Sequence, residues 1–389
     1  MEGRHAYVTP LITAAAVVTA LGHDLETTWQ GLMRGESGIR PVTRFDPSPY
    51  VSGVAACVPG LDAHPPGRSR LHQLLDLLFA DFPAVPEHSL LLAATTKGGI
   101  DALEAHGRGI PSDLADLPLA RLCEATRNRL GLDDPGVVLS AACASSTMAL
   151  GRAAAAIVSG RAQSVLVVCL DLVTEFIFSG FSALRALSPA ACRPFHRRRD
   201  GMSIGEAAAA LLVMSPQCAA GQGLEPLARV TGWAAADDAH HLSAPDPQAG
   251  GLIATCWTAL ARAGLNPQHV AAICAHGTGT AYNDLMELKA YHQVFTPEPP
   301  PLFSVKGALG HAMGASGGVE AALCCLALRD RLTPPTLGCT EPEDLAQGLV
   351  SDQVQPLGPG PVLSANSGFS GINAAVILDV SREDRLEDA

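Results

Sequence analysis

The sequence is poor in charged and in aromatic residues, and both shortages restrict what the protein can be. Only 16% of the 389 residues are charged and 4% are aromatic, whereas 48% are hydrophobic. A chain with this much apolar material can bury a large core, which excludes intrinsic disorder. Acidic residues outnumber basic ones by 38 to 26, giving a net charge of −12. That balance argues against nucleic acid or an anionic membrane surface as the main partner.

Paired cysteine motifs and long apolar runs are also missing. The 11 cysteines form no CxxC pair and no cluster with zinc spacing. We therefore expect reduced thiols in a cytoplasmic protein, without a disulfide framework or a metal site. The apolar stretch 7–21 contains a proline and follows no basic cluster. It is expected to be a buried strand and turn rather than a targeting segment, and no other run is long enough to cross a bilayer.

What the sequence does contain is an alternation of apolar strand-like runs with Ala- and Leu-rich helical stretches, which is typical of an α/β protein with buried sheets. In the first half, a strand over 136–142, a helix over 144–159 and a strand over 164–170 predict one right-handed βαβ crossover.

A second set of elements follows a turn-rich run at 215–223, which is expected to be a linker between domains 1–220 and 221–389. The predicted helices and strands of the second domain are 251–263, 270–275, 285–294, 302–305, 315–329, 362–365 and 374–380.

Cys143 is the first candidate for chemistry. It lies in SAACASSTMAL, where a predicted strand turns directly into a helix. A thiol at a helix N-terminus feels the positive end of the helix dipole and nearby unpaired N–H groups, which favour the thiolate and can stabilise an oxyanion. Buried cysteine is common in proteins, so the local sequence alone leaves a structural role open.

Two histidines and a lysine lie in glycine-rich turns. His276 opens the run HGTGT after an apolar strand, and His311 lies in SVKGALGHAMGASGG just before a helix. Catalytic and structural roles are both open for them. Lys306 is one of only three lysines, with Lys97 and Lys289, so 23 of the 26 basic residues are arginine. Its place five residues before His311 indicates a need for a compact ammonium group, with an ordinary surface lysine as the alternative.

The run NSGFSGIN, residues 366–373, is a further glycine-rich turn between two predicted strands. It is either a plain hairpin or a mobile loop that closes over a site, with Phe369 as an apolar plug.

Taken together, these segments resemble the β-ketoacyl-ACP synthases, condensing enzymes of type II fatty-acid and polyketide synthesis in the thiolase superfamily. The likeness runs from about residue 7 to 380. The motifs that carry it, in the family's order and spacing, are AACASS with Cys143, RDGMSIGE at 199–206, AHGTGTAYND with His276, SVKGALGH with Lys306 and His311, and GGVEAA with Glu320.

The resemblance implies a thiolase-like fold, in which two similar α/β halves form a five-layered αβαβα sandwich. The first half would carry the nucleophilic Cys143 and the second half both histidines. Cys143 would accept an acyl group from acyl carrier protein (ACP). Malonyl-ACP would then lose CO2, and its carbanion would attack that thioester to give a β-ketoacyl-ACP two carbons longer.

The resemblance also implies roles for individual residues. His276 and His311 would donate hydrogen bonds to the enolate as neutral imidazoles, and Lys306 would disfavour the protonated form of one of them. Thr278 and Thr280 match positions that hold the phosphopantetheine arm, and Glu320 matches a buried structural acid. The Cys-His-His set favours an elongating type over the initiating synthases, and no metal or redox cofactor is required.

The implied partners are ACP and a second synthase chain, in a homodimer or in a heterodimer with a second ketosynthase-like chain. Because ACP is acidic, docking needs a local basic patch, with ordinary solvated arginines as the alternative for each candidate. The candidates by position are Arg68, Arg70, Arg197, Arg198 and Arg199.

Two departures from the family pattern affect these expectations. The family's gating loop usually reads NSFGFGGTN; here NSGFSGIN is one residue shorter and places Gly368 and Phe369 after the serine. Two functions of this loop are therefore undecided by the sequence: gating of the acyl pocket, and donation of a backbone N–H to the oxyanion. The region between about 70 and 135 is also shortened, which suits a specialised polyketide or aryl-polyene pathway better than housekeeping fatty-acid synthesis.

Rival interpretations are a chain-length-factor-like subunit of a ketosynthase heterodimer, either non-catalytic or assisting, and a thiolase or simple acyltransferase. Chain length factors typically lack the nucleophilic cysteine, whereas Cys143 is present. A degradative thiolase needs a second reactive cysteine in a C-terminal loop, and NSGFSGIN has none.

Overall fold

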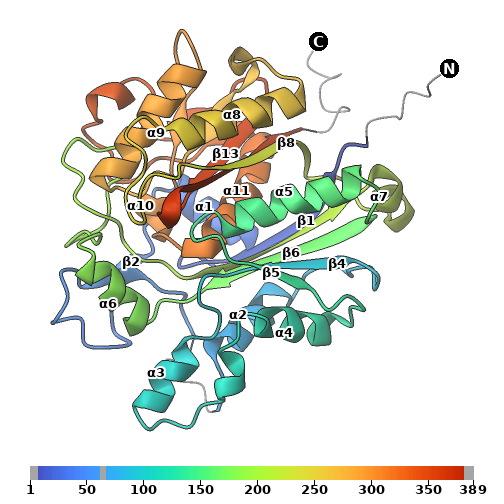
Figure 1. Ribbon diagram of the computed structural model, residues 1–389, viewed down its shortest axis with the longest axis vertical. Helices are drawn as coiled ribbons and strands as arrows, with labels where there is room; N and C mark the ends of the chain where they lie inside the picture. The colour runs from blue at the N-terminus through green and yellow to red at the C-terminus, as the bar shows by residue number, and fades with distance from the viewer. Residues whose placement is uncertain (1–7, 62–66, 381–389) are drawn as a thin grey trace.

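The computed structural model describes residues 8–61 and 67–380 (Figure 1). Its main sheet is built from two groups of five strands with the same order. The first group is β5-β4-β6-β7-β1, and the second is β10-β9-β13-β14-β8. In each group the third strand along the chain lies at the outer edge, followed by the second, fourth, fifth and first. The two similar halves expected from the resemblance are therefore confirmed.

The strands of the first half are β1 (Leu11–Val18), β4 (Leu90–Ala94), β5 (Val137–Leu139), β6 (Ser164–Asp171) and β7 (Ala207–Met214). Those of the second half are β8 (Ala228–Asp237), β9 (Ala272–Cys274), β10 (Leu302–Phe303), β13 (Val362–Ser367) and β14 (Ile372–Asp379). A short antiparallel pairing of β1 with β8 joins the halves into one ten-stranded sheet.

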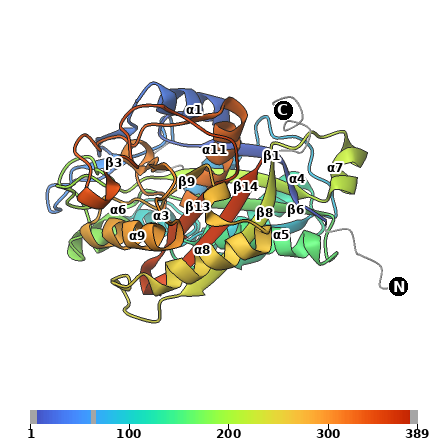
Figure 2. The ribbon, with the colours of Figure 1, turned by 90° about the horizontal axis from the view of Figure 1, so that it is seen from above.

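Helices form the other three layers. Between the two halves lie α5 (Ser145–Val158) and α11 (Ser316–Asp330), which contact each other and strands of both halves. The outer layers are α2 (Arg70–Leu78) with α4 (Arg121–Leu130) on the first half, and α8 (Gly250–Ala263) with α9 (Ala281–Val294) on the second (Figures 1 and 2). The five-layered sandwich is thus confirmed.

Smaller elements complete the chain. They are α1 (Leu25–Met33), α3 (Asp101–Gly107), α6 (Glu175–Ala183), α7 (Pro216–Gln222) and α10 (Lys306–Leu309), with the short strands β2 (Ile39–Pro41), β3 (Val54–Ala56), β11 (Leu332–Thr333) and β12 (Gln355–Pro356). None of the helices in the described part of the chain is long and apolar enough to cross a membrane.

The central helices approach each other closely because their contact surfaces are small. A Cβ atom added to Gly317 would meet the Thr147 Oγ1 atom of α5 at 1.9 Å and Asn366 Oδ1 at 2.5 Å. Glycine at this position therefore permits close contact between α11, α5 and β13. Nearly every residue of α11 is buried, as expected for a helix in the middle layer.

The expectation for one segment is wrong. The run 215–223, expected to be a turn-rich linker, contains the helix α7. The Ser215 hydroxyl accepts a hydrogen bond from the Cys218 N–H, Pro216 occupies the first turn, and Gly223 ends the helix with φ of 65°. Proline at the start and glycine just past the end are helix-boundary signals as well as turn signals. The domain boundary near residue 220 stays a prediction; β7 ends at Met214 and β8 begins at Ala228.

Candidate active site

Cys143 lies in a tight turn between β5 and α5. Within this turn Ala142 has a left-handed backbone with φ of 47°, unusual for a residue other than glycine. The Ala144 N–H donates to the Ala141 carbonyl at 3.1 Å, and the Ser145 hydroxyl donates to the Ala142 carbonyl at 2.6 Å. Such strained backbone is held only where its surroundings fix it, and it is often found at functional sites.

The predicted resting thiolate is wrong. Burial raises the pKa of the Cys143 thiol to about 12, and this effect is larger than the opposing influences of the Lys306 ammonium and the Phe369 backbone N–H. Desolvation outweighs the helix end because the turn lies deep between the layers of the protein. The thiol must therefore lose its proton to a base during reaction.

His311 is placed to be that base. Its Nε2 lies 2.9 Å from Cys143 Sγ, and its Nδ1 lies 2.9 Å from the Ser316 hydroxyl. The RDGMSIGE segment holds the backbone of His311. The His311 N–H donates to the Ser203 carbonyl at 2.7 Å, and the His311 carbonyl accepts from the Gly205 N–H at 3.0 Å. Burial, followed by the charge of Lys306, lowers the pKa of His311 well below its usual value, so the imidazole is neutral.

His276 lies across the cavity, with its ring 5.0 Å from that of His311 in an edge-to-face arrangement. Carboxylates on α9 hold its loop: Glu287 accepts from the N–H groups of His276 and Gly277 at 2.7 and 2.6 Å, and Asp284 accepts from the Thr278 N–H at 3.1 Å. Burial also raises the pKa of Glu287 to about 7. The pKa of His276 is lowered well below normal by burial, then by Lys306, so this imidazole is neutral as well.

Lys306 and Glu320 form a buried ion pair beside the two imidazoles, and each side chain is 1% exposed. Burial raises the pKa of Glu320, while Lys306 and a hydrogen bond from Asn366 oppose that rise. The predicted compact ammonium is therefore in the interior, where its charge disfavours a second positive charge on either histidine.

The turn between β13 and β14 reaches over Cys143. A Cβ atom on Gly368 would lie 3.0 Å from the Cys143 backbone nitrogen, so glycine lets this turn approach the nucleophile. The backbone N–H of Phe369 donates a hydrogen bond to the thiol, and its ring packs on Phe181 with centroids 5.8 Å apart. The Ser370 N–H donates to the Leu242 carbonyl at 2.8 Å, tying the turn to a neighbouring loop.

A cavity of about 360 Å³ opens onto these groups. Cys143, His276 and His311 line its inner end, together with the predicted Thr278 and Thr280. The two threonine hydroxyls lie 2.9 Å apart. Apolar side chains on the wall include Phe181, Leu184, Met202 and Phe369, so the cavity suits a ligand with an apolar part.

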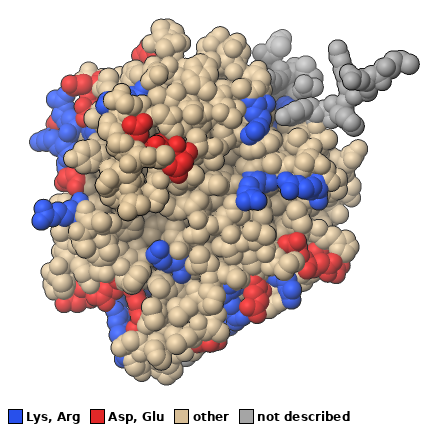
Figure 3. Space-filling view, viewed as in Figure 1, with Lys and Arg blue, Asp and Glu red and all other residues tan. Residues whose placement is uncertain are grey.

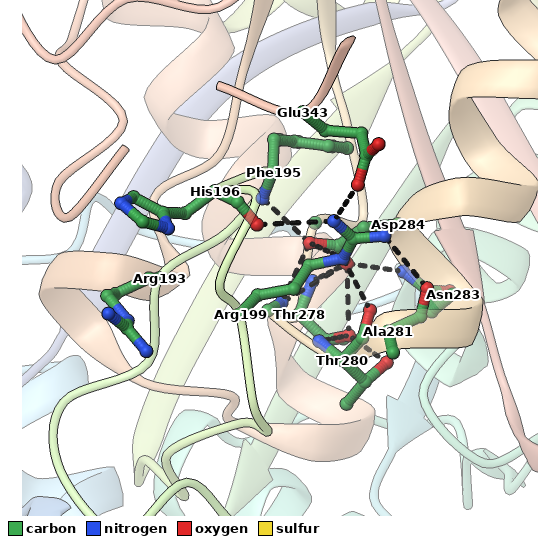
Figure 4. A network of polar contacts seen from close by, with 12 residues as sticks. Arg193, Phe195, His196, Arg199, Thr278, Thr280, Ala281, Asn283, Asp284 and Glu343 are labelled. Atoms are coloured by element: carbon green, nitrogen blue, oxygen red, sulfur yellow. Dashed lines mark hydrogen bonds and ion pairs between the residues drawn. The ribbon is translucent and has the colours of Figure 1, made fainter. Parts of the chain in front are cut away.

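The proposed docking arginines separate into two kinds. Arg70 is 2% exposed, is paired with Asp101 and donates to the Val173 carbonyl, so its predicted docking role is wrong. The side chain of Arg199 is only 5% exposed. It bonds to Glu343 and to the carbonyls of His196, Thr280 and Ala281 (Figure 4), so it supports the loop after His276 and is not available to a partner.

The other three arginines are exposed. Arg197 is ion-paired with Asp344 and Arg198 with Glu341, whereas Arg68 precedes α2 on the surface. Acidic neighbours reduce the positive charge that the first two can offer to a partner. On the face shown in Figure 3, described basic and acidic side chains are interspersed and form no broad basic patch.

Sequence reasoning missed several residues that hold this site. Asp284 and Glu287 lie three residues apart on the helix after HGTGT, and that spacing was the available signal. Ser316 lies in the same glycine-rich run as His311, five residues after it. Asn366 lies in NSGFSGIN, but it contacts His276, which is 90 residues away.

The pH dependence of alkylation tests the resting state of the thiol. Because the pKa of Cys143 is about 12, we expect its alkylation by iodoacetamide to rise about tenfold per pH unit from pH 8 to 10. Peptide mass spectrometry would follow Cys143 separately from the other cysteines, with glutathione as the ordinary thiol. A Cys143 rate that levels off below pH 8.5 would contradict a protonated resting thiol.

Comparison with known proteins shows which family this sequence is similar to. Residues 123–219 match the family described as "Beta-ketoacyl synthase, N-terminal domain", and residues 227–340 match "Beta-ketoacyl synthase, C-terminal domain". A relative from Staphylococcus aureus, named 3-oxoacyl-(acyl-carrier-protein) synthase 2, is 28% identical over 95% of this chain and 97% of its own length. A protein of the same name from Coxiella burnetii shows the same identity and coverage.

Solved structures give the same result. The ishigamide ketosynthase/chain length factor superposes with a TM-score of 0.87 and 28% identity over 97% of this chain and all of the matched chain. A ketosynthase in complex with its chain length factor from Xenorhabdus doucetiae gives 0.82 and 27% over 98% of this chain and all of the matched chain. Because the two family matches together span more than half of its residues, the chain belongs to the β-ketoacyl synthase family.

Proposed function

We propose that this protein is a β-ketoacyl-ACP synthase, a transferase that forms carbon–carbon bonds by decarboxylative Claisen condensation of malonyl-ACP with a Cys143-bound acyl chain. The observation that carries the proposal is the 2.9 Å contact between Cys143 Sγ and His311 Nε2, with His276 in the same cavity. A chain that only shaped a partner's pocket would not need a nucleophile, its base and a second imidazole together.

In the first stage, Cys143 takes the acyl group. The thiol proton moves to His311 Nε2 as the sulfur attacks the carbonyl of the acyl-ACP thioester. The backbone N–H of Phe369, which already donates to the thiol, supports the oxyanion that forms. The bond to the phosphopantetheine sulfur then breaks, and that sulfur leaves with the proton from His311.

In the second stage, malonyl-ACP enters the vacated cavity. The bond between the carboxylate carbon and the methylene carbon breaks, and CO2 leaves. The electron pair of that bond stays with the methylene carbon and forms an enolate, whose oxygen accepts a hydrogen bond from His276. The methylene carbon attacks the Cys143 thioester, and the Cys143 C–S bond breaks. The sulfur regains through His311 the one proton that the overall reaction consumes.

A second candidate is an assisting, chain-length-factor-like role in a ketosynthase heterodimer. It is favoured by the likeness to two structures that contain a chain length factor and by the shortened β13–β14 turn. The complete Cys143, His276 and His311 set favours the catalytic role. Under either role the partners are ACP and a second synthase chain, in a fatty-acid or polyketide pathway that includes the aryl-polyene type.

The test is the intact mass of the protein after exposure to a panel of acyl-ACPs, before and after malonyl-ACP is added. We expect an acyl adduct that disappears as ACP gains a β-ketoacyl group two carbons longer. Cys143→Ala is the control and should form no adduct. An adduct that malonyl-ACP cannot elongate would indicate a simple transferase, and no adduct with any primer would favour the assisting role.

A further inference from the structure

Asn366, at the inner end of β13, is buried and connects three distant parts of the site. Its Nδ2 lies 2.7 Å from Glu320 Oε2 and 3.2 Å from His276 Nδ1. Its Oδ1 accepts a hydrogen bond from the Thr147 hydroxyl on α5. Both N–H groups and the carbonyl oxygen of this amide therefore have partners in the core of the protein, and the side chain is buried.

The charge of its neighbours fixes which way this amide faces. Burial raises the pKa of Glu320, but Lys306 donates directly to Glu320 Oε1, and this paired ammonium opposes that rise and favours the carboxylate form. A carboxylate only accepts hydrogen bonds, so the NH2 group of Asn366 must face it. The amide then has one remaining N–H, which points to His276, and its carbonyl oxygen is left for the Thr147 hydroxyl.

This orientation determines the proton position on His276. The imidazole is neutral, so one ring nitrogen carries a proton and the other accepts. Because Nδ1 accepts from Asn366, the proton is on Nε2. The ring lines the cavity, and one ring nitrogen lies within 4.8 Å of Cys143 Sγ and a nitrogen of His311. With Nδ1 committed to Asn366, Nε2–H is the group available to a ligand.

We propose that Asn366 is a positioning residue: it holds His276 in the Nε2–H tautomer and so makes His276 a donor to the oxygen that becomes negative when the malonyl thioester loses CO2. The chain from Lys306 through Glu320 and Asn366 to His276 thus connects the buried ion pair to the enolate. The tautomer assignment rests on the contacts of Asn366 together with the neutral state of His276, whereas the effect on decarboxylation rests on the proposed function.

The tautomer is measured first on the unmodified protein. In protein labelled with 15N-histidine, with His276→Asn used to assign the signal, we expect His276 to show a protonated Nε2 and an unprotonated Nδ1. A protonated Nδ1 in the wild-type protein would overturn the proposal, and no variant of Asn366 is needed to obtain this result.

Asn366→Asp tests the consequence with a side chain of nearly the same shape. Its carboxyl group, sharing a proton with Glu320, accepts from Nδ1–H and leaves a lone pair on Nε2. We expect the tautomer signals to reverse and CO2 release from malonyl-ACP to fall about 10²- to 10³-fold, the usual loss for one oxyanion donor. Acylation of Cys143 should persist, because none of the hydrogen bonds of Asn366 involves Cys143 or His311.

Ser364→Ala is the matched control. Ser364 lies two residues earlier on β13, and its buried hydroxyl has no hydrogen-bond partner among the described residues. This variant should keep the wild-type tautomer and rate. An Asn366→Asp protein that reverses the tautomer yet decarboxylates at the wild-type rate would remove the positioning role. If the wild-type protein neither acylates Cys143 nor decarboxylates malonyl-ACP, the proposed function fails while the tautomer result stands.

Discussion

His311→Ala is expected to slow acylation of Cys143 about 10²- to 10⁴-fold, the usual range for loss of a positioned base. The effect should be large because the thiol has a pKa of about 12 and His311 Nε2, at 2.9 Å, is the acceptor for its proton. Single-turnover mass measurements with a labelled acyl-ACP would give the rate of this step.

His276→Ala is the comparison that makes the result specific. His276 makes no hydrogen bond to the thiol among the described contacts, so acylation should stay close to the wild-type rate while decarboxylation falls about 10²- to 10³-fold. Equal slowing of acylation in the two variants would contradict the division of roles between the histidines.

Lys306→Met is expected to lower the free energy of unfolding by about 3 to 5 kcal/mol, because it leaves the Glu320 carboxylate buried without its counter-charge. The two side chains are each 1% exposed, so water cannot replace the lost partner. Chemical denaturation followed by circular dichroism would measure the change.

The control is the double variant Lys306→Met with Glu320→Gln, in which neither position of this buried pair carries a charge. The new amide oxygen can still accept the hydrogen bond from Asn366, so most of the lost stability should return. If the single and double variants are equally unstable, the loss comes from packing around Lys306 and not from the unpaired charge.

The central helices were the most predictable part of the fold. The runs 144–159 and 315–329 are long, rich in alanine and leucine, and correspond to α5 and α11. Strands were less predictable at their ends: β9 and β10 are shorter than the apolar runs 270–275 and 302–305, because residues outside the paired ladder remain apolar when they are buried. At α7, proline and glycine were interpreted as turn signals although they mark the two ends of a helix.

In the site, too, local motifs predicted the reactive residues, whereas properties that depend on distant contacts could not be predicted. Motifs identified Cys143 and the two histidines, but a local pattern cannot report burial, and burial is what raises the pKa of the thiol. The same limit explains Arg70, which looks like surface charge in sequence and is paired in the interior. The contacts of Asn366 span 46 residues to Glu320 and 90 to His276, so no short motif encodes them.

The repeated strand order has a consequence for the history of the site. Two halves with the same order are what duplication of a smaller, self-associating ancestor would leave, and here the copies have divided the chemistry. Cys143 lies just ahead of α5 in one copy, and His311 lies just ahead of α11 in the other. Each copy therefore supplies a different reactive group at the equivalent helix start. The contact between the two copies must persist, because the proton of the Cys143 thiol passes to His311 across it in the proposed cycle.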